Sequence, residues 1–221
     1  PSNLLVDGDC HLKICDFGLA RGFVSADDAL TKCVATRWYR APEVLLLAEE
    51  YTVAIDLWAV GCIFCEMLGG TPLFPGQGPV DQLKKIVQVV GTPTDEEMAW
   101  MGAGPGRKLL RKCGSFAAVD LATLFPAATS AALSFTAGLL QFDPSKRLTV
   151  DGAMNHGFLA ALQAYDEPLS ATVIDWGFDN FEPTRALLQQ HLHEECVRYR
   201  ARGLDSRKTD GLSPHAVVSC H

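Results

Sequence analysis

Residues 54–69, AIDLWAVGCIFCEMLG, are apolar on nearly every helical face, which predicts a helix buried through the middle of a domain. Gly69, Gly70 and Pro72 supply the signals that end it. A shorter helix is expected after Pro42. Amphipathic patterns predict further helices at 80–91, 94–101, 130–141, 149–162 and 182–200.

The N-terminal residues alternate between short apolar runs and turn residues. NLLV and HLKIC flank an Asp-Gly pair, a strong signal for a β-hairpin. Residues 18–43 have no hydrophobic period and predict a long loop, whose basic and aromatic content favours a functional role. Residues 102–128 predict an irregular insert, and 201–221 a polar, mobile tail. The expected fold is mainly α with one small β-hairpin.

Composition narrows the classes of partner. The 221 residues fit one domain or two, and their net charge of -7 argues against nonspecific nucleic-acid binding. No apolar run reaches the roughly 18 to 20 residues of a membrane helix, so neither nucleic acid nor membrane is expected as a partner. The first residues also lack the features of a signal peptide.

The eight cysteines are scattered, and several lie inside apolar runs. This distribution favours reduced thiols in a reducing compartment over disulfides. We therefore expect an intracellular protein of the cytoplasm, with the nucleus as an open alternative.

Oxygen ligands for a hard cation lie at the end of the predicted hairpin. Asp16 leaves the second strand in the sequence CDFGLA, and a carboxylate there can present its oxygens to Mg²⁺. Asn3, on the other strand, can offer a second oxygen to the same place. The alternative is a turn in which Asp16 only caps the backbone.

Four motifs occur in a fixed order: PSNLL at the start, DFG at 16–18, APE at 41–43 and DLWAVG at 56–61. With this set the chain resembles the eukaryotic protein kinases. TRWYRAPE, FPGQGPVDQL, GTPT, LFP and FDPSKRLTV resemble the mitogen-activated protein kinase branch. The resemblance extends from Pro1 to about Tyr199.

The resemblance implies the larger, C-terminal lobe of the kinase fold, with the N-terminal lobe absent from these residues. The lobe would comprise residues 1–162, with an activation segment at 16–43 and an insert at about 93–128. Residues 163–200 would be a C-terminal extension that packs toward the smaller lobe.

Several catalytic parts of the family do not occur in the 221 residues. These are the His-Arg-Asp-Leu-Lys run before PSNLL, the glycine-rich phosphate loop, the strand lysine and the helix glutamate. GAGPGRK at 102–108 follows no predicted strand, so we expect a loop there and no phosphate cradle. The 221 residues alone are therefore expected to be inactive.

By resemblance, ATP and Mg²⁺ are the cofactors. Asn3 and Asp16 would hold the metal ions and act in catalysis. Leu5 would lie under the adenine, Cys15 would face the nucleotide, and Ser2 would lie near the ribose.

The resemblance also assigns the long loop. Thr36 would reach back to the catalytic loop, while Arg37 and Arg40 would line the pocket for the residue after the phosphorylated Ser or Thr. In this branch that residue is proline, so the expected substrates are proteins with Ser-Pro or Thr-Pro sites.

The family's Thr-x-Tyr activation triplet is here Thr31 to Cys33. Because a thiol is not phosphorylated, our hypothesis is that an upstream kinase acts on Thr31 alone. Cys33 is then a small filler or a redox-sensitive thiol.

Further residues are assigned to scaffold and docking. Glu43 and Arg147 are paired in the family, and this predicts a buried ion pair. Asp56 would tie the central helix to the catalytic loop. Asp166 and Glu167 resemble the branch's acidic docking patch, although a merely solvated acidic pair is an equal alternative.

Two other constellations could suggest metal sites. HLHEEC at 191–196 could suggest zinc, but residues at i and i+2 of a helix face apart, which favours a solvated surface. Cys62 and Cys65 are expected to be packing thiols.

Two functions thus remain open. One is a proline-directed serine/threonine kinase, and the other is a kinase-derived docking module without catalysis.

Overall fold

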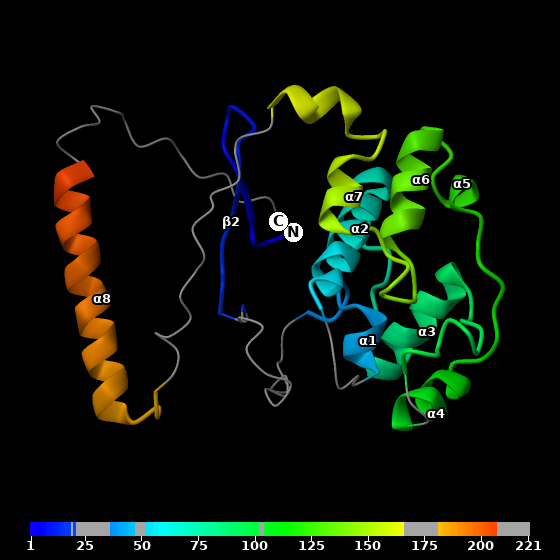
Figure 1. Cartoon of the computed structure of the whole chain (residues 1–221), viewed down its shortest axis with the longest axis horizontal. Helices are drawn as coiled ribbons and strands as arrows, with labels where there is room; N and C mark the ends of the chain where they lie inside the picture. Colours follow the sequence, from blue (N-terminus) through cyan, green and yellow to red (C-terminus); the bar gives the residue numbers. More distant parts are fainter. Residues whose placement is uncertain (19, 21–35, 47–51, 102–103, 166–180, 207–221) are drawn as a thin grey trace. The chain divides into compact units, whose positions relative to one another are not determined.

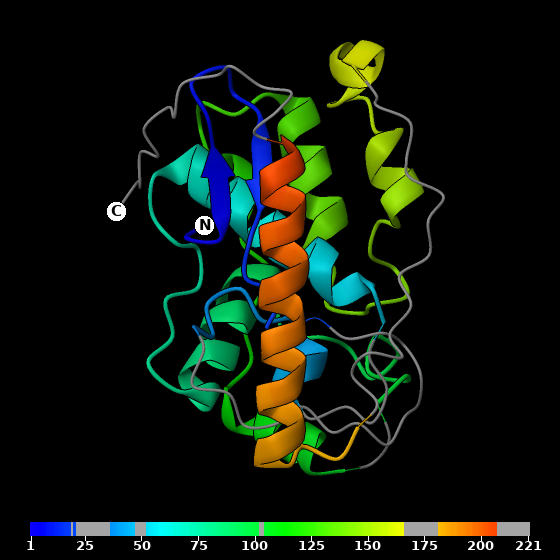
Figure 2. The ribbon, with the colours of Figure 1, turned by 90° about the vertical axis from the view of Figure 1, so that its left-hand side faces the viewer.

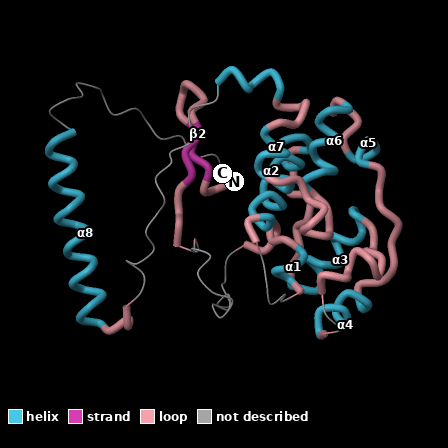
Figure 3. The backbone as a smooth tube through the Cα atoms, in the orientation of Figure 1, coloured by secondary structure: helices cyan, strands magenta, loops and turns pink. Residues whose placement is uncertain are grey.

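The computed structural model describes residues 1–18, 20, 36–46, 52–101, 104–165 and 181–206. Within these ranges helices dominate, and the two strands pair only with each other, as Figure 3 shows. The predicted mainly α fold with one small hairpin is confirmed. The chain forms two compact units, Pro1–Val24 with Leu169–His221, and Ser25–Pro168.

The hairpin consists of β1, Leu4–Val6, and β2, Leu12–Ile14, in antiparallel register with Leu4 opposite Ile14 (Figure 2). Its turn differs from the two-residue Asp-Gly turn that the sequence predicts. Asp7 Oδ1 accepts hydrogen bonds from the backbone N–H groups of Asp9 and His11, at 3.0 and 2.9 Å. Cys10 takes the left-handed conformation, with φ 65°. The aspartate side chain therefore stabilises a longer connection.

The larger unit is built around α2, Ala54–Gly69, and α6, Ser130–Leu139, which pack against each other (Figure 1). Trp58, Cys62 and Cys65 of α2 are buried. The prediction of burial on all faces is wrong in part, because Val60 and Met67 are exposed. One side of α2 faces the core and the other does not.

Among the described residues, three helices of the same unit begin with proline and pack on one another. Helix α1, Pro42–Leu45, packs on α3, Pro79–Val90, and α3 packs on α4, Pro105–Lys112. Each begins with proline. The N–H groups of the first helical turn have no partner within the helix, so proline at this position breaks no hydrogen bond. Phe74, just before α3, stacks on Trp58 with ring centroids 5.9 Å apart. The core thus joins α3 to the centre of the unit.

The helix predicted at 94–101 is wrong, because the chain forms successive turns there. Thr94 and Glu97 do form a reciprocal cap, with bonds of 2.9 and 3.2 Å. The Arg107 guanidinium binds the carbonyl oxygens of Met98 and Met101, at 2.7 and 3.1 Å. The sequence Gly104-Pro105 follows closely, so any helix starting here would be too short to be stable by itself.

The prediction that 102–128 form an irregular insert is also wrong in part. It contains α4 and α5, Leu121–Leu124, whose N-cap Asp120 accepts from the Ala122 N–H at 3.0 Å. The supposed loop GAGPGRK therefore includes the start of α4. Arg111 and Lys112 lie in the last turn of α4, where positive charge interacts favourably with the helix dipole.

Two further helix boundaries differ from the prediction. Residues 149–162 form only α7, Val150–Met154, followed by a 3-10 helix at Ala160–Tyr165. The Asn155 side chain donates to the Asp151 carbonyl at 2.9 Å and ends α7. Helix α8, Arg185–Ser206, continues into the region expected to be a tail. No helix among the described residues is both long and apolar enough to cross a membrane.

Candidate functional site

The open end of the hairpin carries the residues predicted to contact nucleotide. The Cys15 N–H donates to the Asn3 carbonyl at 2.9 Å, which extends the ladder beyond the two strands. Residues directly opposite each other, and residues two apart on one strand, share a face of a β-ribbon. The register therefore places Asn3, Leu5 and Cys15 on one face, which Lys13 shares.

Asp16 follows at the end of this face in an unusual backbone conformation. Its φ is 61°, in the left-handed region that aspartate tolerates better than most residues. The Gly18 N–H donates to Asp16 Oδ1 at 3.3 Å, and the side chain is otherwise exposed. Asn3 is also exposed, with its Oδ1 3.4 Å from the Ser2 hydroxyl that donates to it.

An amide oxygen and a carboxylate are the ligand types that Mg²⁺ prefers, so the donor set of Asn3 and Asp16 fits this cation. The local Asp16–Gly18 bond equally fits the capping alternative.

The basic turn at 37–40 lies in the larger unit and is closed by the Arg40 N–H, which donates to the Arg37 carbonyl at 3.0 Å. Arg37 and Arg40 are half-buried, and Thr36 is exposed. Two side chains between the arginines fix the turn. Trp38 Nε1 donates to the Gly76 carbonyl at 3.2 Å, and the Tyr39 hydroxyl donates to Glu66 Oε2 at 2.7 Å. The pKa of Tyr39 is raised, first by burial and then by the Glu66 carboxylate.

Gln82 of α3 completes the support of this turn. Its Nε2 donates to the Trp38 carbonyl at 3.2 Å, and its Oε1 accepts from the Gly76 N–H at 3.1 Å. Sequence reasoning did not find Trp38, Tyr39, Glu66 or Gln82. The signals were the motifs TRWYRAPE, which contains Trp38 and Tyr39, and FPGQGPVDQL, which contains Gln82, but neither motif shows what these side chains bind.

Glu43 and Arg147 form the predicted buried ion pair, which is confirmed. Arg147 Nη1 and Nη2 donate to the two carboxylate oxygens of Glu43 at 2.8 and 3.1 Å. Arg147 is 4% exposed and Glu43 is 1% exposed. The same guanidinium binds the carbonyls of Ala54 and Gln141 and lies 5.2 Å from the centre of the Trp58 ring. It therefore joins the end of the 37–43 segment to α2.

Asp56 lies in the first turn of α2 and is exposed. The His-Arg-Asp-Leu-Lys part of its predicted partner, the catalytic loop, does not occur in these 221 residues, so the role of Asp56 stays a prediction. Cys62 and Cys65 are buried in the core, as predicted for packing thiols. Burial raises the pKa of both, that of Cys65 to about 12.

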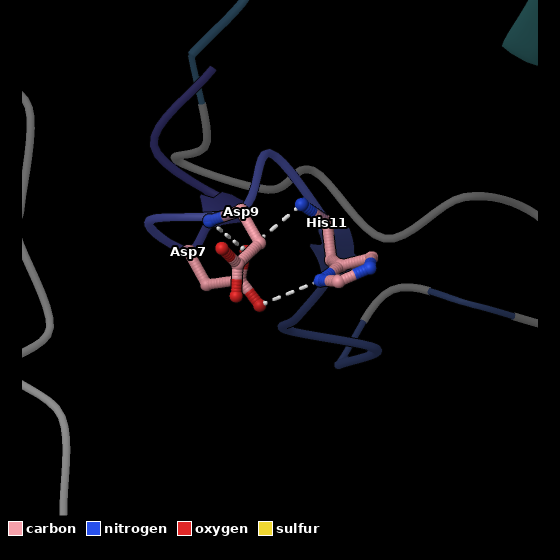
Figure 4. Close-up of side chains that lie close together, drawn as sticks. All are labelled: Asp7, Asp9 and His11. Carbon is pink, nitrogen blue, oxygen red and sulfur yellow. Dashed lines mark hydrogen bonds and ion pairs between the residues drawn. The ribbon is translucent and has the colours of Figure 1, made fainter.

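A different cluster lies in the hairpin turn, where Asp7, Asp9 and His11 bring potential ligand atoms within 4.8 Å of one another (Figure 4). All three are exposed, and Asp7 already accepts from His11 Nδ1 at 3.1 Å as well as from the turn backbone. The backbone N–H of His11 lowers the pKa of Asp7 most. These contacts account for the cluster as a turn.

The histidine-rich stretch of α8 makes local contacts in the described part of the chain. The His191 ring lies 4.5 Å from the Phe181 ring, and its Nδ1 lies 3.9 Å from Glu194.

Thr31, Cys33, Asp166 and Glu167 lie outside the described residues, so the regulatory and docking roles stay predictions.

The comparisons with known proteins agree with the motifs. The family model described as protein kinase domain matches residues 1–159. The chain is 44% identical over 199 residues to mitogen-activated protein kinase SLT2/MPK1 of Saccharomyces cerevisiae. It is 44% identical over 206 residues to mitogen-activated protein kinase MPS1 of Pyricularia oryzae, and 42% over 205 residues to extracellular signal-regulated kinase 1 of Dictyostelium discoideum.

These alignments cover 88%, 90% and 90% of the chain, but only 41%, 49% and 38% of the three relatives. The chain thus spans less than half the length of these proteins.

Proposed function

Since the chain belongs to the protein kinase family and to its mitogen-activated branch, we propose that it forms the C-terminal lobe of a serine/threonine kinase. The reaction is transfer of the γ-phosphoryl group of ATP to Ser or Thr followed by proline. Residues 1–162 form the lobe, and residues 163–200 extend toward the smaller lobe. The curated names of the relatives support the activity, and the helix-rich fold is compatible with the lobe.

The structural observation that carries the proposal is the hairpin register. It brings Asn3 opposite Cys15, the residue before Asp16, so two residues that carry oxygen ligands lie at the same end of the hairpin. A Mg²⁺ ion held there would supply the positive charge that phosphoryl transfer needs at the phosphates. Asn3 and Asp16 would hold the ion, and Leu5 and Cys15 share the face expected to receive the nucleotide.

The substrate site is proposed at residues 37–40. Proline has no backbone N–H, so a pocket for it needs no acceptor for that group. Arg37 and Arg40 on the fixed turn border this pocket, and Thr36 precedes it. Ser-Pro and Thr-Pro sites are therefore the expected substrates.

The test is phosphorylation of a Ser-Pro peptide by the native protein carrying Asp16→Asn. Loss of a metal ligand removes several kcal/mol of transition-state stabilisation, so the rate should fall on the order of 10²–10³-fold. Asp9→Asn changes another exposed aspartate of the same hairpin and should leave the rate unchanged. Equal rates in the two variants would contradict the assignment.

The 221 residues in isolation provide the second half of this test. They contain no His-Arg-Asp catalytic motif, so we expect peptide phosphorylation at the level of a buffer control. Robust transfer by purified 1–221 would contradict the lobe proposal. Peptide binding without transfer by the native protein would favour the docking module instead.

A further inference from the structure

Gln82 is a polar side chain with no access to solvent. It lies in α3 and is 0% exposed, among the largest fully buried side chains of the described residues. Burying an amide is unfavourable unless its donor and acceptor both find partners. Here Nε2 meets the Trp38 carbonyl and Oε1 meets the Gly76 N–H, at 3.2 and 3.1 Å. Both ends of the amide are used, so its orientation is fixed.

The two partners of Gln82 also bind each other. Trp38 Nε1 donates to the Gly76 carbonyl at 3.2 Å, which closes a ring of three hydrogen bonds. We call Trp38, Gly76 and Gln82 the amide triangle. It joins the basic turn to the loop before α3 and to α3 itself, with Trp38 and Gln82 44 positions apart in the sequence.

Gly76 shows how closely the triangle is packed. A Cβ atom at this position would lie 2.5 Å from both Cα and Oε1 of Gln82. Real Cβ atoms do not approach backbone this closely, so the loop tolerates only glycine without moving. The Trp38 carbonyl thus has a rigid donor opposite it.

The held carbonyl lies inside the turn that carries Arg37 and Arg40. Tyr39 anchors the same turn to α2 through Glu66, in a separate hydrogen bond of 2.7 Å. With Tyr39 tied to one element and Trp38 to another, the backbone between the two arginines has little freedom. Loss of the Gln82 donor would release the backbone carbonyl of Trp38, while the ring of Trp38 would keep its bond to Gly76.

We propose that Gln82 is a positioning residue for substrate selection, holding the backbone of Trp38 so that residues 37–40 shape the pocket for proline. This inference rests on the proposed function. Gln82 does not touch the reacting atoms, so its removal should alter peptide discrimination rather than chemistry.

The test compares Gln82→Met with Gln88→Met in the native protein. Methionine keeps the unbranched shape and fills the space without hydrogen bonds. Gln88 lies on the same helix and is exposed, which makes it a matched control. The measurement is the ratio of dissociation constants for a Ser-Pro peptide and a Ser-Ala peptide, by fluorescence anisotropy without ATP. Loss of one buried hydrogen bond should reduce this discrimination roughly three- to tenfold in Gln82→Met only.

A merely structural role for Gln82 would lower the melting temperature and leave the ratio unchanged, which would overturn the proposal. So would a wild-type protein that does not discriminate between the peptides. Because binding is measured without ATP, failure of phosphoryl transfer would refute the proposed function and still leave this measurement decisive.

Gln82→Glu keeps the test available if Gln82→Met does not fold. A protonated carboxyl can donate to the Trp38 carbonyl and accept from the Gly76 N–H, as the amide does. Ionisation removes that donor. Proline discrimination should therefore be near wild type at low pH and fall as pH rises through the pKa of the new carboxyl, which burial raises. Discrimination by this variant that does not change with pH would also overturn the proposal.

Discussion

The guanidinium of Arg147 is buried and binds a carboxylate and two backbone carbonyls. Its planar set of N–H donors reaches Glu43, Ala54 and Gln141 at the same time. Lysine carries one compact charged group and cannot reproduce this geometry. The residue is therefore specified by shape as well as by charge.

Removing Arg147 should be far more costly than removing a surface arginine. Arg147→Ala leaves the Glu43 carboxylate buried without its partner, and we expect a loss of about 3–5 kcal/mol in the free energy of unfolding. Arg111→Ala, at an exposed position of α4, should stay within about 0.5 kcal/mol. Urea denaturation of both variants measures the difference. Comparable losses would show that the pair contributes little.

The residues that the sequence could and could not predict differ in the kind of partner they have. Glu43 and Arg147 lie in recognisable motifs, and their opposite charges suggest that they pair. Gln82 binds a backbone carbonyl and a backbone N–H, and backbone groups are the same at every position. No pattern of residue types can show such a contact. The amide triangle is visible only in the folded chain.

At the level of elements, the close approach of α2 and α6 depends on Gly61. A Cβ atom there would lie 2.8 Å from Leu140 Cδ2 and 3.0 Å from Leu139 Cβ. Leu140 can shift its side-chain end, but the Cβ of Leu139 moves only with its helix. The apolar run around Gly61 predicts the helix, while the glycine determines how near α6 can come.

Gly61→Ala should therefore destabilise the protein even though alanine favours helices. The helix preference is worth about 1 kcal/mol, and overpacking a core costs about 1–3 kcal/mol, so we expect a net loss of about 1 kcal/mol. At Gly157 an added Cβ meets nothing within 4 Å. Gly157→Ala should be neutral or stabilising by up to about 1 kcal/mol. Thermal unfolding distinguishes the two, and a rise in melting temperature for Gly61→Ala would refute the packing argument.

Elements were predicted well where apolar residues recur over several helical turns, on one face in α3 and on most faces in α2 and α6. Prediction failed where distant side chains decide the backbone. Thr94 and Glu97 have the local signature of a helix start, but Arg107 binds the carbonyl oxygens of Met98 and Met101. The residues at 94–97 show the cap, but they do not show that the Arg107 guanidinium binds carbonyl groups of this segment.

At the level of the whole molecule, the candidate residues divide between the two compact units. Asn3 and Asp16 belong to one unit, and the basic turn with Arg37 and Arg40 belongs to the other. The chain passes from Asp16 to Thr36 through residues 17–35, which include Thr31 and Cys33. In the sequence, Thr31 therefore lies between the proposed metal ligands and the proposed substrate turn.

We expect the native protein to be switched on by phosphorylation of Thr31 alone. A phosphate adds about two negative charges and can form one to three charge-assisted hydrogen bonds, for which Lys32, Arg37 and Arg40, close to Thr31 in the sequence, are the candidate donors. Thr31→Ala should therefore lower activity after treatment with the upstream kinase by at least about tenfold. Cys33→Ser keeps the size of the side chain and removes the thiol, and it should retain activity. Mass spectrometry of the activated protein locates the phosphate, and peptide phosphorylation measures the effect. Full activity in Thr31→Ala would refute single-site switching, and loss confined to Cys33→Ser would identify the thiol as the switch.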